Sequence, residues 1–159
     1  MKKIVLIIAL VWTAVSSAQE HSGFNYKEDK ENVVASAIDG VWRTKNAQTK
    51  EQITFRKDLS ALKRVAEHRK IFEKFSIYHA GYMEIVSEES FKNGTYPFLL
   101  IETNGNPHLA FFREKEGNPV GSIQSFILFI AIGEEKAEDR LFVGGKRNDQ
   151  PFTEFERVE

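Results

Sequence analysis

The 159-residue chain contains no cysteine and no long block of one charge. Without cysteine there is no disulfide bond, no catalytic thiol and no lipid anchor on a cysteine, so the fold depends on its hydrophobic core alone. The 22 basic and 23 acidic residues are interleaved along the chain. Proteins that bind nucleic acids or anionic membrane surfaces normally carry a basic patch or stripe. The sequence therefore predicts neither of these partners.

The first 18 residues have the three-part layout of a secretory signal peptide. Lysines at positions 2 and 3 precede an apolar run over 4–15, and small residues follow at Ser16 and Ala18, the positions that a signal peptidase reads. The run is 12 residues long, whereas a membrane-spanning helix needs about 20. A permanent N-terminal anchor is the alternative, and this length disfavours it. We predict cleavage between Ala18 and Gln19, a secreted or periplasmic protein, and no stable membrane span after cleavage.

After the signal peptide, the chain divides into a polar leader and one domain. Residues 19–32 show no hydrophobic period and are predicted to form a flexible leader. Residues 33–159 contain no linker, repeat or low-complexity tract, and their number suits a single hydrophobic core. All 13 phenylalanines and all four tyrosines lie after the signal peptide. We therefore expect one domain with a core rich in aromatic side chains.

Short hydrophobic segments separated by turn residues predict a series of β-strands. Alternation is clear where Ile53 and Phe55 lie on one face and Arg56 lies on the other. Asn104-Gly105 predicts a tight hairpin, because both central positions of a type I′ turn need positive φ. The eight predicted strands are near 40–46, 51–57, 76–87, 97–103, 107–114, 123–133, 139–144 and 151–158.

One segment departs from the β pattern. Residues 58–74 contain no glycine or proline and are rich in strong helix formers. Leu59, Leu62 and Val65 recur at helical spacing, and Asp58 is a suitable N-cap. We predict a helix over 58–74. A β-hairpin is the alternative, because hydrophobic residues at 65, 71, 75 and 77 share odd numbering.

The order of these elements predicts the fold class. Consecutive strands joined mainly by tight turns are typical of an antiparallel meander or barrel. The strands near 98–101, 109–112 and 126–132 are apolar on both faces, so their outer face must be covered. The predicted fold is mainly β, an antiparallel up-and-down eight-stranded meander or barrel with one helix (about 58–74) packed on it.

Gly40-Val41-Trp42, at the start of the first predicted strand, resembles the Gly-x-Trp motif of the lipocalins and the wider calycin family of small β-barrels. In that family the tryptophan lies across the closed end of the barrel, and an arginine near the last strand packs over its ring. The resemblance thus assigns Gly40, Trp42 and Arg157 to closure of the barrel. It also implies a short helix over 33–38, leading into the first strand.

The sequence shows no catalytic or metal-binding constellation. His79 and His108, with Glu84 or Glu102, are the residues that could surround a metal ion, yet no histidine pair has the spacing of metal ligands. Surface or hydrogen-bonded histidines and solvated glutamates are favoured. Gly-Gly-Lys at 144–146 follows a strand without a helix to receive a phosphate, so we predict a hairpin loop there. We predict no catalytic residue, no metal and no cofactor.

Three hypotheses for function follow. The first is an exported lipocalin-like binding module for a small apolar or amphipathic molecule, based on the strand order, the aromatic content and the resemblance. The alternative is a secreted protein-interaction or inhibitor domain with a packed interior and an extracellular protein partner. The third is an enzyme of unknown type. A large apolar cavity would favour the first hypothesis, because an eight-stranded barrel encloses either packed side chains or one small ligand.

Overall fold

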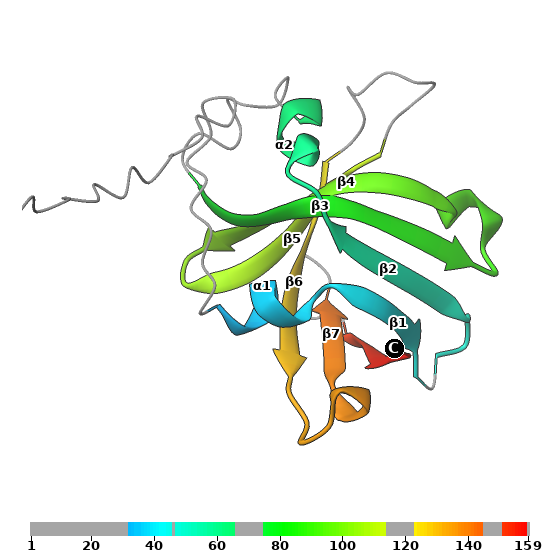
Figure 1. The fold of residues 1–159 in the computed structure, drawn as a ribbon. Helices are drawn as coiled ribbons and strands as arrows, with labels where there is room; N and C mark the ends of the chain where they lie inside the picture. Colours follow the sequence, from blue (N-terminus) through cyan, green and yellow to red (C-terminus); the bar gives the residue numbers. More distant parts are fainter. Residues whose placement is uncertain (1–31, 46, 66–74, 114–122, 145–150, 159) are drawn as a thin grey trace, which may run out of the picture.

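The structure, a computed structural model, describes residues 32–45, 47–65, 75–113, 123–144 and 151–158. Within these residues, eight antiparallel strands pair in sequence order, and β8 pairs with β1 to close a barrel (Figure 1). The predicted mainly β, eight-stranded, up-and-down fold is confirmed. The strands are β1 (Gly40–Thr44), β2 (Glu51–Lys57), β3 (Ser76–Ser87), β4 (Gly94–Thr103), β5 (Asn106–Phe112), β6 (Ile123–Ala131), β7 (Arg140–Gly144) and β8 (Thr153–Arg157).

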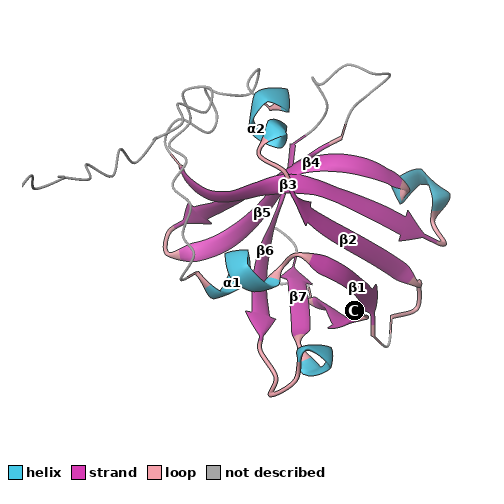
Figure 2. Cartoon of the chain, viewed as in Figure 1, coloured by secondary structure: helices cyan, strands magenta, loops and turns pink. Residues whose placement is uncertain are grey.

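The helices of the described residues are short and lie at the ends and on the outside of the barrel (Figure 2). They are α1 (Val33–Ala37), α2 (Ser60–Arg64), and the 3₁₀ turns η2 (Ser90–Lys92) and η3 (Lys136–Glu138). The predicted signal peptide and most of the predicted leader lie outside the described residues.

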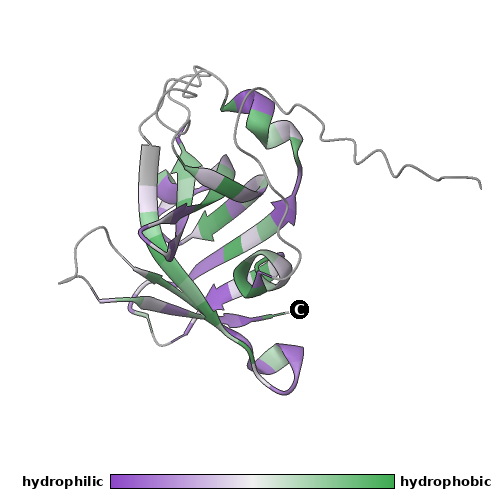
Figure 3. Ribbon diagram, turned by 90° about the vertical axis from the view of Figure 1, so that its left-hand side faces the viewer, coloured by the Kyte–Doolittle hydropathy of each residue, from purple (hydrophilic) through white to green (hydrophobic). Residues whose placement is uncertain are grey.

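The barrel interior holds the main hydrophobic core. On β2, Ile53 and Phe55 are buried, whereas Arg56 is exposed, so the alternation predicted for this strand is present. The core continues around the barrel through residues of the other strands, among them Met83, Phe98, Leu128 and Phe155. Figure 3 shows hydrophobic residues running through the strands, whereas the hairpin around η3 is mainly hydrophilic.

A second hydrophobic cluster covers the outer face of β3, β4 and β5. Leu62 and Val65, from α2 and the residue after it, pack with Ile77, Leu99 and Phe112. β4 and β5 are therefore buried on both sides, as their sequences predicted. For β6 that prediction is wrong, because Leu128 faces the core whereas the outward-facing Phe129 is exposed. The predicted packing of a helix on the sheet is observed at α2 (Figure 1).

The structure describes only the first part of the predicted 58–74 helix, since 66–74 lies outside the described residues. Within the described part, the alternative of a β-hairpin is wrong, because Ser60–Arg64 is helical. The predicted N-cap is also wrong: the cap is Leu59, and the Asp58 carboxylate instead accepts a hydrogen bond of 2.8 Å from the backbone N–H of Ser60. Hydrogen bonds from the Ser60 side chain and backbone lower the pKa of Asp58.

The β4–β5 connection is the predicted two-residue hairpin. Thr103 pairs with Asn106. Asn104 and Gly105 between them have φ angles of 53° and 75°. Positive φ at both positions is what a type I′ turn requires, and asparagine and glycine adopt it most easily.

The α1 helix lies at one end of the barrel, next to the start of β1. The Asn32 side chain caps it by accepting hydrogen bonds from the backbone N–H groups of Val34 and Ala35. Val34, Ala35 and Ile38 join the core inside the barrel. The short helix predicted over 33–38 is thus present.

Candidate functional site

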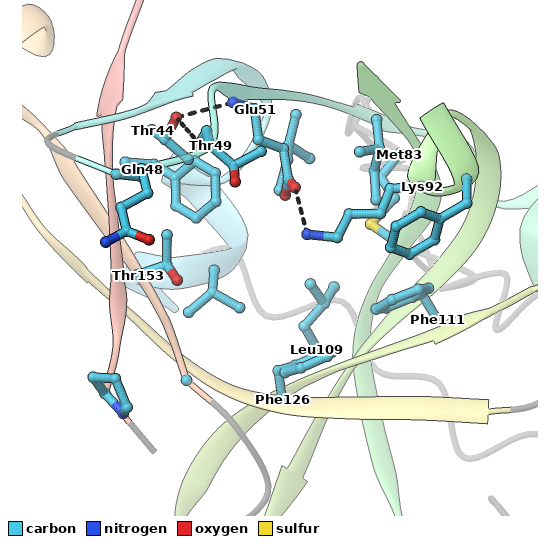
Figure 4. Close-up of a pocket in the computed structure, with 18 of the residues that line it drawn as sticks. Thr44, Gln48, Thr49, Glu51, Met83, Lys92, Leu109, Phe111, Phe126 and Thr153 are labelled. Carbon is cyan, nitrogen blue, oxygen red and sulfur yellow. Dashed lines mark hydrogen bonds and ion pairs between the residues drawn. The ribbon is translucent and has the colours of Figure 1, made fainter. Parts of the chain in front are cut away.

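A cavity of about 770 Å³ opens at one end of the barrel interior (Figure 4). Its deeper walls are apolar side chains of β2, β3, β5 and β6, which alternate along their strands so that every second residue faces inward. Apolar residues of these walls include Ile53, Met83, Ile85, Leu109, Phe111 and Phe126.

The mouth of the cavity is polar and is formed by the ends of strands and by connections between them. Thr44, Gln48 and Thr49 contribute from the β1–β2 connection and the strand before it, and Lys92 comes from η2 between β3 and β4. The Thr44 hydroxyl accepts a hydrogen bond of 3.0 Å from the backbone N–H of Glu51. The cavity thus combines an apolar interior with polar groups at one end.

The Lys92 side chain extends from η2 over the mouth and forms an ion pair with Glu51 of β2 (Figure 4). Its Nζ lies 3.5 Å from Oε2 of Glu51 and also forms an ion pair with Glu89. The hydrogen bond to Glu89 is the main cause of a raised pKa of Lys92, to which the negative charge of Glu51 also contributes. Lys92 therefore stays positively charged, and its charge is balanced by the two carboxylates of the protein.

The opposite end of the barrel is closed by Trp42 and Arg157. Trp42 is fully buried, and its Nε1–H donates a hydrogen bond of 2.7 Å to the carbonyl oxygen of Ile38. The Arg157 guanidinium carbon lies 4.2 Å from the centroid of the Trp42 ring. The structure thus brings together the tryptophan and the arginine of the lipocalin resemblance.

Arg157 also attaches the end of α1 and the residue before β1 to the last strand. Its Nη1 donates to the carbonyl oxygen of Asp39 at 2.9 Å, and its Nη2 donates to that of Ala37. Its Nε donates to Oδ2 of Asp139 at 3.0 Å, and the side chains of this ion pair are only 7% and 6% exposed. Gly40, the remaining residue of the motif, has a φ of 131°, which favours glycine where the chain turns into β1.

Sequence reasoning missed Asp139 and Asp39 as parts of the closed end. Asp139 follows η3, and its Oδ1 also accepts a hydrogen bond from the backbone N–H of Gly133. Asp39 lies with its Oδ1 3.2 Å from Nε2 of His79, whose ring is buried and packs near Phe98. No local pattern distinguished these aspartates from the other acidic residues, because their partners are distant in the sequence.

The four residues considered as metal ligands do not form one site. His79 pairs with Leu100 and faces the interior, whereas His108 pairs with Ile101 of the outer cluster. Glu84 and Glu102 are exposed and lie opposite Thr95 and Ser76, near the two ends of the β3–β4 pair. Thr95 and Glu102 are seven residues apart on β4, so the two glutamates are separated by roughly 23 Å at about 3.3 Å per residue. Within the described residues, no group of three or more candidate ligands is placed to hold a metal ion.

Gly144 ends β7 and lies at the cavity, whereas 145 and 146 of the Gly-Gly-Lys segment lie outside the described residues. β7 and β8, the strands before and after the Gly-Gly-Lys segment, pair antiparallel, as in a hairpin.

No protein-family model matches the chain, and comparisons with curated proteins and with solved structures gave no significant match. Among the helices described, none is both long enough and apolar enough to cross a membrane.

Proposed function

We propose that the protein is an exported binding module that holds one small apolar or amphipathic molecule inside its barrel. The cavity of about 770 Å³ is the observation that supports this function. Ligand sites in proteins are concave, mostly apolar and about 300–1,000 Å³ in volume, with a few polar groups that orient the ligand. This cavity has an apolar interior and gathers its polar groups at the mouth.

The cavity also favours ligand binding over the alternative of a protein-interaction domain. That alternative predicted an interior filled by side chains, and an eight-stranded barrel is small enough for side chains to fill it completely. Here the aromatic residues divide into two roles. Phe55 and Phe98 pack edge to face, 5.2 Å apart, in the filled part of the core, whereas Phe111 and Phe126 stack at 5.7 Å beside the cavity.

The lipocalin-like character of the proposal is supported by the closed end. A glycine at positive φ, a buried tryptophan under an arginine and a preceding short helix occur together in one eight-stranded antiparallel barrel. Export is supported by the three-part layout of residues 1–18.

The neutral fluorescent probe N-phenyl-1-naphthylamine tests the proposal. We expect its emission to rise on addition of the purified protein, because it moves from water into an apolar site. Val143 lines the cavity, so Val143→Phe should fill part of the space and weaken probe binding by about tenfold. Val86→Phe makes the same change at an exposed position and should leave binding unchanged.

Probe binding that is absent in the wild type, or equal in the wild type and Val143→Phe, would contradict the proposal. Circular dichroism spectra of both variants check that the barrel still forms, so that loss of binding is not confused with loss of fold.

A further inference from the structure

Arg113, the residue after β5, brings a positive charge to the mouth of the cavity. Phe111, two residues earlier, lines the cavity, and the intervening Phe112 packs in the outer cluster. The alternation of the strand thus carries through to Arg113, which also lines the cavity. Its guanidinium carbon lies 5.8 Å from the ring centroid of Tyr96 and 6.0 Å from that of Phe91.

The guanidinium of Arg113 is only partly satisfied by the described residues. Nη2 donates a hydrogen bond of 3.2 Å to the carbonyl oxygen of Phe91. Nε is buried and has no hydrogen-bond partner within the part of the chain that the structure describes. The guanidinium has five N–H groups, and the described residues accept a hydrogen bond from one of them.

The charges around the mouth identify the kind of acceptor. Lys92 already forms ion pairs with Glu51 and Glu89. Across the described ranges, Arg113 forms no ion pair with a carboxylate, so its positive charge is the one left uncompensated beside the cavity. Glu51, the acidic residue lining the cavity, is engaged by Lys92, and this disfavours a ligand with a positive head group.

We propose that the ligand is an amphiphile with one carboxylate head group, which Arg113 binds at the mouth while the apolar tail lies inside the barrel. This inference rests on the proposed binding function and names the class of ligand. The planar guanidinium matches a carboxylate with two parallel N–H···O bonds, which are stronger than bonds to neutral acceptors. The tail would lie along Phe111, Leu109 and Met83, the apolar wall below the mouth.

The test is competition for bound N-phenyl-1-naphthylamine among three molecules with the same twelve-carbon chain: dodecanoate, dodecanol and dodecyltrimethylammonium. In the wild type, dodecanoate should displace the probe at a concentration about tenfold or more below that of dodecanol, since charge-assisted hydrogen bonds are worth this factor. The cationic molecule should be the weakest competitor.

Variants of Arg113 locate the head-group site. Arg113→Gln removes the charge and should abolish the preference for dodecanoate, while binding of the neutral probe persists. Arg113→Lys keeps the charge without the planar fork and should retain part of the preference. Arg56→Gln, at an exposed position on β2, is the matched control and should behave as the wild type.

The outcomes separate this inference from the proposed function. Failure of the neutral probe to bind the wild type would contradict the binding function itself. Probe binding with equal competition by dodecanoate and dodecanol, or strongest competition by the cation, would overturn the head-group assignment alone. A preference for dodecanoate that survives in Arg113→Gln would overturn the role of Arg113. Should Arg113→Gln fail to fold, the wild-type ligand series and Arg113→Lys still decide the question.

Discussion

Removal of the Arg157 side chain should strongly destabilise the barrel. In Arg157→Ala, the carboxylate of Asp139 remains buried without its cation, and the carbonyl oxygens of Ala37 and Asp39 lose their donors. The Trp42 ring loses a guanidinium at 4.2 Å and the cover of the aliphatic part of the arginine. The change therefore removes the hydrogen bonds by which this side chain attaches the end of α1, Asp39 and Asp139 to the last strand.

The buried ion pair between Arg157 and Asp139 accounts for most of the expected loss in the free energy of unfolding. Removing one partner of a buried pair costs about 3–5 kcal/mol, because the other charge stays in the protein unpaired. The side chains of this pair are 7% and 6% exposed, so solvent screens them little. The lost carbonyl hydrogen bonds and the cation–π contact belong to the same side chain, so their costs do not simply add. We expect a loss of about 4 kcal/mol in the free energy of unfolding.

Urea unfolding followed by tryptophan fluorescence measures this loss. In a chain that starts at Gln19, Trp42 is the single tryptophan, and its buried ring should emit at short wavelength and resist quenching by iodide. Arg157→Ala should increase quenching, whereas Arg56→Ala, at an exposed position, should change stability by no more than about 0.5 kcal/mol.

A second substitution tests whether the unpaired charge of Asp139 causes the expected loss of stability. If the unpaired Asp139 charge causes most of the loss, Asp139→Asn in the Arg157→Ala background should recover part of the stability. A loss below about 1 kcal/mol in Arg157→Ala, with quenching unchanged, would refute the argument that this arginine holds the closed end.

Three further predictions concern the backbone and the N-terminus. Gly105→Ala should cost about 1 kcal/mol in unfolding free energy through its φ of 75° alone, since a Cβ there meets no atom within 4 Å; no loss would contradict the turn assignment. Gly81→Ala should lower the free energy of unfolding by about 3 kcal/mol or more, because its Cβ would lie 2.0 Å from the Arg56 carbonyl oxygen. Thermal unfolding measures this loss, and unchanged stability would argue against the β2–β3 register. N-terminal sequencing of the exported protein should begin at Gln19, and an intact Met1 in the membrane fraction would contradict the signal peptide.

The strand order was predictable because its signals are local. Alternation at Ile53 and Phe55, the Asn104-Gly105 turn and the runs that are apolar on both faces each reflect a period or a turn within a few residues. Closure of the sheet depends on pairing of β1 with β8, which no local pattern reports. The fold class predicted from the sequence accordingly named both a meander and a barrel, and the preference for a barrel came from the lipocalin resemblance.

The candidate site was less accessible to sequence reasoning. Whether the aromatic residues fill the interior or line a cavity depends on how side chains from different strands pack, and a count of phenylalanines cannot distinguish the two. The position of Arg113 did carry a signal that went unused. It lies two residues after Phe111, so the period of the strand placed a charged residue on the interior-facing side at a strand end.

Arg157 and Arg113 show how similar local surroundings lead to different roles at the two ends of the barrel. Each guanidinium lies within 6.0 Å of an aromatic ring centroid. At the closed end, the buried Asp139 carboxylate balances the charge of Arg157, and two backbone carbonyls accept hydrogen bonds from its guanidinium. At the mouth, the described residues offer Arg113 one carbonyl and no carboxylate. Arg157, whose charge is balanced by a buried carboxylate, holds the fold together, whereas Arg113, to which the described residues bring no carboxylate beside the apolar cavity, is suited to bind the head group of the proposed ligand.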